Sequence, residues 1–204
     1  MNPSAGDTAT ATRFGFGTMR LALGVLVSSL CASQLCASEI RTCFTPGEDC
    51  TALIVQQIDA AKSELLVQAF LFNSVPILQA IANAHDRGVA VRVVLDRVHE
   101  EKPSIAATYL RNHRIRVLID DKVATAHNKV MVIDRRNTIT GSFNFTTRAQ
   151  ARNAENVLVV LDDPVVAKAY ADNWRRRAEA SRKYRNVGAR RDAPISGPAD
   201  GVVR

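Results

Sequence analysis

The chain has 204 residues, which is enough for one ordinary domain with a surplus at each end and excludes an array of several domains. Hydrophobic residues make up 47% of the sequence but aromatic residues only 5%, a balance that suits an α/β domain built on Val, Ile and Leu. The formal net charge of +7 favours a polyanionic partner, such as nucleic acid or an anionic membrane, and says nothing about the fold.

The N-terminal segment has the layout of a secretory signal. Arg13 and Arg20 precede a short apolar run over residues 21–27, and small residues follow it. The run is too short to span a bilayer as a helix, which needs about 20 apolar residues. We therefore predict that residues 1–38 are a signal peptide, that the mature protein is periplasmic or secreted, and that it does not stay inserted in the membrane. A retained membrane anchor is the alternative.

Two cysteines, Cys43 and Cys50, remain after the predicted cleavage and flank a Pro-Gly turn. An even pair of cysteines in an exported chain is typical of a disulfide. A metal site would need further ligands nearby, and the sequence offers none there. We predict a Cys43–Cys50 disulfide and no metal site.

The spacing of apolar residues predicts alternating helices and strands. In chain order they are a helix over 51–62, a strand over 64–72, a helix over 75–87 ended by Gly88, a strand over 89–95, a helix over 103–112, strands over 115–119, 129–134 and 138–140, a short helix over 146–151, a strand over 156–161 and a final helix capped by Asp163. This alternation predicts an α/β fold with a mixed, mostly parallel β-sheet flanked by helices on both faces. We expect the domain over residues 39–185 and a disordered basic tail over residues 186–204.

Polar side chains that could surround a phosphate gather in the second half of the chain. His127 and Lys129 stand two residues apart, so on an extended strand both project from the same face. Ser142 and Asn144, again two apart, offer neutral hydrogen-bond donors, and the preceding Gly141 lets a backbone approach a ligand closely. The set combines one cation, several neutral donors and a nitrogen nucleophile.

A carboxylate follows at Glu155, which could hold the far nitrogen of the imidazole and fix its tautomer. The spacing His-x-Lys-x4-Asp-x6-Gly-Ser-x-Asn resembles the signature of the phospholipase D superfamily, and every position is filled: His127, Lys129, Asp134, Gly141, Ser142 and Asn144. Further segments resemble the small bacterial Nuc-type endonucleases, and this similarity covers most of residues 40–185. The resemblance implies a phospholipase D-like single domain that hydrolyses phosphodiesters.

The resemblance also implies a role for each residue of the site. His127 would attack phosphorus to form a phosphohistidine, while a second histidine protonates the leaving oxygen and later activates water. Lys129 and Asn144 would bind the non-bridging oxygens, with assistance from Ser142. Glu155 would orient the nucleophile, and Asp134 would have a structural, ion-pairing role near the site. No metal or other cofactor takes part in this chemistry.

The implied mechanism needs two histidines, but this chain carries the motif once. Larger relatives carry two copies of the motif, whereas small ones form a two-fold dimer that joins two motifs at one site. We therefore predict an obligate homodimer with its two-fold axis beside His127.

The favoured function is a metal-independent, nonspecific endonuclease acting on DNA, or on RNA. The alternative is a phospholipase D acting on phospholipid head groups, because the motif fits any phosphodiester. Lipid enzymes of the superfamily usually carry two motifs and large insertions, and this chain has neither, while its positive charge favours a nucleic-acid backbone. A third hypothesis is a degenerate relative that only binds nucleic acid, and the intact motif argues against it.

Several other polar residues are expected to be ordinary surface groups. We interpret His99 as a surface or capping residue and the pair Asp120–Asp121 as a solvated cap. The basic residues over 175–185 form a solvated helix face or contact phosphates. Phe143 and Phe145 alternate with the donors of the motif and are expected to face the core.

Overall fold

A computed structural model describes residues 38–101 and 103–185. The predicted tail and, apart from its last residue, the predicted signal peptide lie outside the described residues. Within the described part of the chain, no helix combines the length and the apolarity needed to cross a membrane.

Helices and strands alternate along the chain, mostly within a few residues of the predicted bounds. The first are β1 (Glu39–Thr45), α1 (Cys50–Asp59), β2 (Glu64–Ala69), α2 (Val75–Asp86) and β3 (Ala90–Asp96). Next come α3 (Val98–Glu101), α4 (Ile105–Asn112), β4 (Arg116–Asp120), β5 (Lys129–Ile133) and β6 (Asn137–Gly141). The last are α5 (Thr147–Arg152), β7 (Glu155–Leu161), α6 (Pro164–Ala180) and β8 (Arg182–Lys183). Apolar spacing does not predict β1, α3 or β8.

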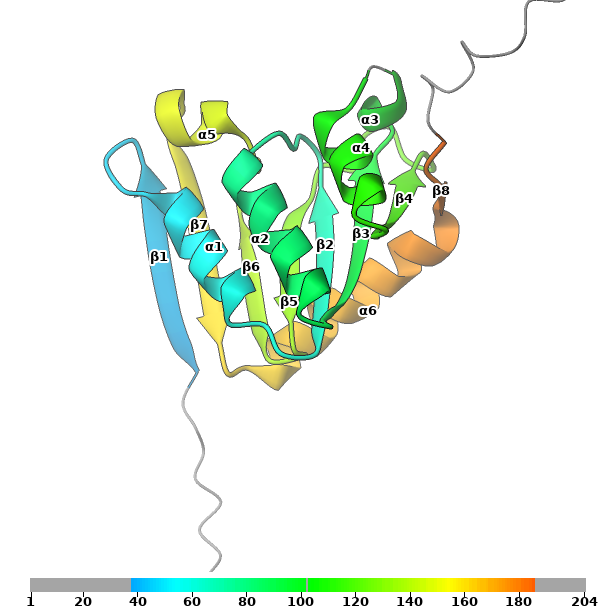
Figure 1. Cartoon of the computed structure of the whole chain (residues 1–204). Helices are drawn as coiled ribbons and strands as arrows, with labels where there is room; N and C mark the ends of the chain where they lie inside the picture. Colours follow the sequence, from blue (N-terminus) through cyan, green and yellow to red (C-terminus); the bar gives the residue numbers. More distant parts are fainter. Residues whose placement is uncertain (1–37, 102, 186–204) are drawn as a thin grey trace, which may run out of the picture. The chain divides into compact units, whose positions relative to one another are not determined.

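The described strands form one eight-stranded sheet in the order β1-β7-β6-β5-β2-β3-β4-β8 (Figure 1). Among them, β2–β3 and β3–β4 pair in parallel, while the remaining neighbours are antiparallel. The mixed α/β sheet is confirmed, but the expectation that most strands are parallel is wrong. A parallel pair needs a long crossover, usually a helix. α2 and the α3–α4 segment supply such crossovers from β2 to β4, whereas a short turn over residues 134–136 joins β5 to β6 and makes them antiparallel.

Helices cover both faces of this sheet (Figure 1). α1, α2 and α4 pack on one face, where alternate residues of β2 such as Leu65 and Val67 join the larger cluster of buried apolar side chains. α6 covers the other face, where Leu66 packs with Trp174 and the Trp174 indole donates a hydrogen bond to the Val67 carbonyl at 2.8 Å. Both faces of β2 are therefore buried, which accounts for the consecutive apolar residues over 65–67.

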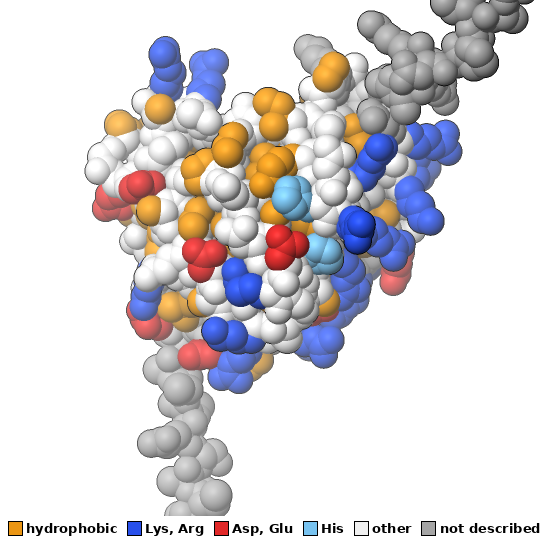
Figure 2. Space-filling view, viewed as in Figure 1, with side chains coloured by type: hydrophobic (Ala, Val, Ile, Leu, Met, Phe, Trp, Pro, Cys, Tyr) orange, Lys and Arg blue, Asp and Glu red, His pale blue; other side chains and the backbone are white. Residues whose placement is uncertain are grey.

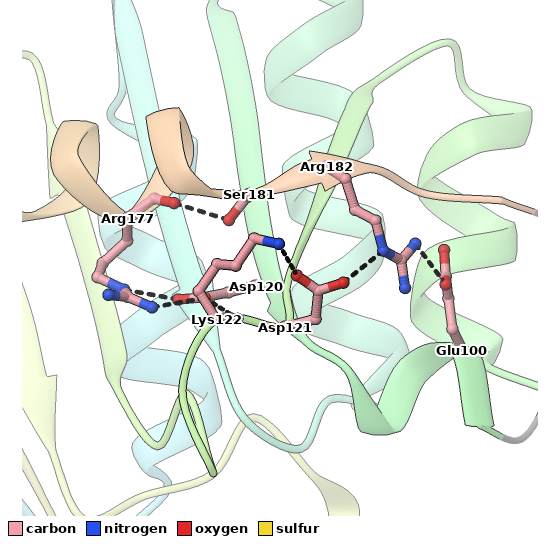
Figure 3. Close-up of polar contacts among 7 residues, drawn as sticks. All are labelled: Glu100, Asp120, Asp121, Lys122, Arg177, Ser181 and Arg182. Atoms are coloured by element: carbon pink, nitrogen blue, oxygen red, sulfur yellow. Dashed lines mark hydrogen bonds and ion pairs between the residues drawn. The ribbon is translucent and has the colours of Figure 1, made fainter.

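Ion pairs attach the end of α6 and the start of β8 to the end of β4 and to α3 (Figure 3). Arg177 donates to both carboxylate oxygens of Asp120 at 2.7 and 2.6 Å. Arg182 pairs with Asp121 and with Glu100, each at 2.6 Å. Asp120 is fully buried, so its interpretation as a solvated cap is wrong. Its charge is compensated by a guanidinium that arrives from a helix distant in sequence.

The predicted disulfide between Cys43 and Cys50 is confirmed. It joins β1 to the first residue of α1. β1 pairs along its whole length with β7, from Glu39 opposite Leu161 to Thr45 opposite Glu155. The disulfide therefore ties this edge strand to the helix layer that covers the larger core.

Candidate active site

Residues of the predicted motif meet at one end of the sheet. Lys129 is the first residue of β5, Gly141 the last of β6 and Glu155 the first of β7. These strand ends lie side by side because the three strands are antiparallel neighbours. A hollow of about 370 Å³ opens here, lined by His127, Lys129, Gly141 and Ser142 and, across from them, by side chains of α6. We call it the catalytic hollow.

The side chains of His127 and Lys129 lie in contact. The Lys129 Nζ lies 3.0 Å from each ring nitrogen of His127 and donates a hydrogen bond to the His127 carbonyl at 2.7 Å. The Phe70 ring packs against the imidazole with centroids 4.7 Å apart, and the same ring lies 5.4 Å from Nζ. His127 is exposed whereas Lys129 is buried. Solvent can therefore reach the imidazole, while protein groups hold the cation beside it.

Burial sets the electrostatics of Lys129, which is only 6% exposed. Loss of water lowers the pKa of this ammonium below its ordinary 10.5, while the nearby charge of Glu155 acts in the opposite direction. A buried ammonium needs protein groups in place of its lost hydration, and the His127 carbonyl and the Glu155 carboxylate supply them. A phosphate oxygen that enters the catalytic hollow would meet a cation with little competing water.

Glu155 is held by two hydrogen-bond donors. The Ser142 hydroxyl donates to one of its oxygens at 2.6 Å and the Asn153 side chain to the other at 2.8 Å. Its backbone amide donates to the hydroxyl of Thr45 on β1 at 3.1 Å. Among the described residues no hydrogen bond joins Glu155 to His127, and the carboxylate acts on Lys129 through its charge. The orienting role that the resemblance implies for Glu155 stays a prediction.

Gly141 permits a close approach between two strands rather than between backbone and ligand. A Cβ at this position would lie 2.2 Å from the carbonyl oxygen of Asn156, and the residue has a φ of +147°. The same carbonyl accepts from the amides of Ser142 at 3.1 Å and Phe143 at 3.2 Å. The chain turns there, so that Phe143 is buried, as predicted, and Asn144 partly buried. The Asn144 Oδ1 has no hydrogen-bond partner among the described residues, which leaves the amide incompletely used by the protein.

Asp134 follows the last residue of β5 and so lies at the opposite end of that strand from Lys129, roughly 16 Å away at about 3.3 Å per residue. Its carboxylate accepts from the amides of Lys62, Ser63 and Glu64 at 2.9, 2.7 and 3.0 Å. Burial works to raise the pKa of Asp134, but these hydrogen bonds outweigh it and hold the pKa below the ordinary 3.8. Its partners are amides and a hydroxyl that anchor the turn after β5, so the expectation of an ion pair near the site is wrong, while its structural role stays a prediction.

A buried carboxylate that sequence reasoning missed holds the segment before His127. Asp96, the last residue of β3, is 3% exposed. Its Oδ2 accepts from the amide of Ala126 at 2.6 Å and its Oδ1 from the amide of Val98 at 2.9 Å. An acidic residue at the carboxyl end of an otherwise apolar strand is the signal that could have revealed it. Asp96 fixes the backbone immediately before His127.

His99 is buried, which contradicts its interpretation as a surface residue. Its Nε2 lies 2.8 Å from the Phe70 carbonyl, and because a carbonyl only accepts, Nε2 carries the proton. Its Nδ1 lies 2.6 Å from the Ser104 hydroxyl, which donates to it in the neutral form. Burial lowers the pKa of His99 below its ordinary 6.5, in keeping with that neutral form. His99 therefore supports the residue whose ring packs on His127.

α6 supplies the wall of the catalytic hollow opposite β5 and β6 through Tyr170 and Asn173. The two residues are three apart, so they lie on the same flank of the helix. Tyr170 also packs against the smaller buried cluster around Trp174, which is the inward packing that helical periodicity predicts. Asn173 has no such sequence signal, because its position depends on how α6 crosses the sheet.

Asp134→Asn tests the structural role of this motif residue. We expect the free energy of unfolding at pH 7 to fall by about 1–2 kcal/mol, because a charged acceptor of several amides is lost. The turnover per folded molecule should equal that of the wild type. The folded-state pKa is depressed, so the stabilisation is present above the ordinary carboxylate pKa and disappears as the pH falls through the folded-state value. Urea unfolding at pH 7 and about pH 3 measures this, and the difference between wild type and variant should shrink at the lower pH. Lost turnover at unchanged stability would contradict the assignment.

Asp96→Asn tests the support of the His127 segment. An amide in place of the carboxylate turns an NH₂ group toward one of the two backbone amides, so the segment must shift. We expect kcat for a small diester such as bis(p-nitrophenyl) phosphate to fall by about tenfold or more with little change in KM, because a displaced nucleophile loses alignment. Asp86→Asn, at the exposed end of α2, is the matched control, and circular dichroism checks the fold of both variants. Wild-type kcat in a folded Asp96→Asn variant would rule the support out.

Comparisons with known proteins agree with the geometry of this site. A family model described as "Cardiolipin synthase, PLD-like domain" matches residues 54–177. The chain is 43% identical to "Phospholipase D" of Rickettsia felis over 145 residues, which cover 71% of this chain and 72% of that protein. It is 36% identical to "Mitochondrial cardiolipin hydrolase" of Homo sapiens over 120 residues, which cover 59% of this chain and 48% of that protein.

Two solved structures resemble the fold. Nuc from Salmonella typhimurium, a phospholipase D family member, is 30% identical with a TM-score of 0.70, over 73% of this chain and 99% of that one. NucT from Helicobacter pylori is 19% identical with a TM-score of 0.66, over 72% of this chain and 99% of that one, a likeness of fold alone. By its matched domain, its relatives and its fold, the chain belongs to the phospholipase D superfamily of phosphodiesterases.

Proposed function

We propose that this protein is a metal-independent endonuclease that hydrolyses the phosphodiester bonds of DNA, or of RNA, through a phosphohistidine. The observation that carries the proposal is the contact between the exposed His127 and the buried Lys129 in an open hollow. Attack on a phosphodiester requires an accessible nucleophile and positive charge for the developing oxyanion. The Lys129 ammonium supplies the charge that a metal ion supplies in other phosphodiesterases.

The reaction proceeds in two displacements. In the first, a ring nitrogen of His127 bonds to phosphorus and the bond to the leaving oxygen breaks, while that oxygen takes a proton from a second histidine. In the second, water bonds to phosphorus and gives a proton to the same second histidine, and the bond between phosphorus and His127 breaks. Lys129 and Asn144 bind the non-bridging oxygens with assistance from Ser142, and Glu155 orients the nucleophile.

The second histidine is the His127 of a second copy of the chain. Among the described residues, no histidine other than His127 lines the catalytic hollow. Large apolar side chains near this end of the sheet are exposed, namely Leu71 at 39%, Val75 at 57% and Ile105 at 61%. Figure 2 has hydrophobic side chains gathered on the upper part of the face that α2 and α4 cover. An exposed apolar patch of this kind supports burial against a partner.

Nucleic acid is the substrate that the size and charge of the chain favour. The likeness to Nuc extends over 99% of that small protein, and the net charge of +7 suits a phosphate backbone. The second candidate is a phospholipid head group, which the names of the Rickettsia and human relatives support. Both substrates present the same diester to His127, so an assay with each decides between them.

We place the protein outside the cytoplasm, as a chain whose residues 1–38 are a cleaved signal peptide and whose residues 39–185 form the catalytic domain. The Cys43–Cys50 disulfide supports this placement, because such bonds persist in oxidising compartments.

Nicking of supercoiled plasmid by the disulfide-intact protein in excess EDTA tests the proposed activity. We expect nicking that EDTA does not reduce and that His127→Ala lowers by about 10³-fold or more, because the nucleophile is lost. His113→Ala, at the end of α4, is the control and should nick like the wild type. Cleavage abolished by EDTA would refute metal independence. Head-group release from phosphatidylcholine vesicles without any nicking would move the assignment to the lipid substrate.

Light scattering tests the dimer. We expect twice the mass of one mature chain, reduced to the mass of a single chain in Ile105→Asp/Val75→Asp, because charges in an apolar interface oppose association. Plasmid nicking should disappear with the dimer, since each site then lacks its second histidine. Val165→Asp changes a residue that is 78% exposed at the start of α6 and should leave both mass and nicking intact. A fully active monomer would contradict the shared site.

A further inference from the structure

A second hollow, of about 280 Å³, lies on the sheet face that α6 covers. Three arginines line it, Arg92 of β3, Arg116 of β4 and Arg175 of α6. Its floor is apolar and includes Trp174 and Leu118 of the smaller buried cluster. We call it the basic hollow. Its lining places three cations around an apolar floor, which suits an anionic ligand.

The basic hollow keeps an excess of positive charge. Each of the two carboxylates that pair with its arginines also pairs with another cation: Glu64 with Arg92 and Arg135, and Asp172 with Arg175 and Lys168. Arg116 has no ion pair among the described residues, and Glu179 is the acidic side chain of the lining. In and around the hollow, five cations therefore meet three carboxylates. The cations are Arg92, Arg116, Arg135, Lys168 and Arg175, and the carboxylates are Glu64, Asp172 and Glu179. A bound anion would relieve the repulsion among the cations.

Arg92 is held in place before any ligand arrives. Its guanidinium carbon lies 5.5 Å from the centroid of the Trp174 ring, a cation–π contact over the floor of the hollow. Its pairing with Glu64, which is 6% exposed, fixes it from the other side. A fixed, planar guanidinium loses little freedom when it donates to a phosphate, which it can do through two N–H groups at once.

α6 lies between the basic hollow and the catalytic hollow and lines both. With 3.6 residues per turn, Tyr170 and Asn173 occupy the flank toward the catalytic hollow, Arg175 the opposite flank, and Arg176 the exposed outer face. A nucleic-acid strand that leaves the catalytic hollow and crosses α6 would pass Arg176. It would reach the basic hollow within a few nucleotides, because the helix with its side chains is about 10–12 Å wide. The edge of β4 and β8 adds further Lys and Arg side chains, seen at the right of Figure 2.

We propose that the basic hollow binds a backbone phosphate of the nucleic acid whose scissile bond lies in the catalytic hollow. This inference rests on the proposed nuclease function and adds to it a site that reads phosphate and no base, so its binding is independent of sequence. It also divides the basic residues over 175–185 into two groups. Arg177 and Arg182 serve the internal ion pairs with Asp120 and Asp121, whereas Arg175 and Arg176 face the ligand.

Fluorescence anisotropy with labelled oligodeoxythymidylates of about 4 and about 16 nucleotides tests the proposal, lengths that span common single-strand site sizes. The protein is the full chain with His127→Ala, so that nothing is cleaved. We expect Arg116→Gln/Arg175→Gln in this background to weaken binding of the long oligonucleotide by about tenfold, with the loss confined to that length. The slope of log affinity against log salt should fall by roughly 0.7 for each phosphate group that the variant no longer neutralises.

The control is Arg41→Gln/Arg111→Gln, which removes two exposed arginines that line neither hollow. It should retain the affinity for the long oligonucleotide. Circular dichroism and thermal unfolding check the fold of the variants. If the double variant unfolds, Arg116→Gln alone takes its place in the binding experiment, because this change breaks no ion pair among the described residues. Equal losses in the control and in the double variant, or no loss in either, would overturn the proposal.

Vesicles of phosphatidylglycerol and phosphatidylcholine provide a further arm. If Arg116→Gln/Arg175→Gln lowers vesicle binding and leaves oligonucleotide binding intact, the ligand is a lipid surface and the inference is wrong. Anisotropy reads binding and not hydrolysis, so it separates the two claims. A protein that binds the long oligonucleotide through the basic hollow but nicks no plasmid would refute the nuclease function and leave the phosphate site standing.

Discussion

The buried ammonium of Lys129 is the group on which the catalytic end of the molecule depends. A cation with 6% exposure needs compensation from the protein, and the His127 carbonyl and Glu155 provide it. Lys129 stands opposite Ala69 where β5 pairs with β2. A slip of one residue in this pairing would turn the ammonium to the other face of the sheet. The register of the β2–β5 pair therefore determines whether the positive charge lies in the site.

Carboxylates outside the catalytic hollow hold the backbone that carries the motif residues. Asp96 accepts from the amide that precedes His127, and Asp134 anchors the turn that follows β5. Asp163 accepts from two amides in the first turn of α6, the helix that walls the catalytic hollow. Each carboxylate accepts hydrogen bonds from backbone amides that would otherwise have no partner in a loop or at a helix end. A motif aspartate can thus be part of a catalytic signature through folding alone.

The elements and the motif could be predicted because their signals are local. A β-branched run marks β3, Gly88 has the positive φ of 93° that ends α2, and Asp163 caps α6. The direction of β6 relative to β5 also had a local signal, because three residues between the predicted strands over 129–134 and 138–140 are too few for the crossover that a parallel pair needs. Asp120 reads as solvated until Arg177 arrives from 57 residues away, and the amide partners of Asp134 lie 70 to 72 residues earlier. These contacts exist in the folded chain and not in any window of the sequence.

The edge strand β1 has a consequence for the synthesis of the protein. Thr45, at its end, donates to the Asn153 carbonyl at 2.9 Å and accepts from the Glu155 amide, a residue 110 positions further along the chain. β1 is therefore translated long before its partner strand β7, and it pairs with no other described strand. Contacts of such high sequence separation form late, because the intervening chain must first be ordered. During synthesis, Glu155 therefore reaches its place beside Thr45 only after β7 has left the ribosome and paired with β1.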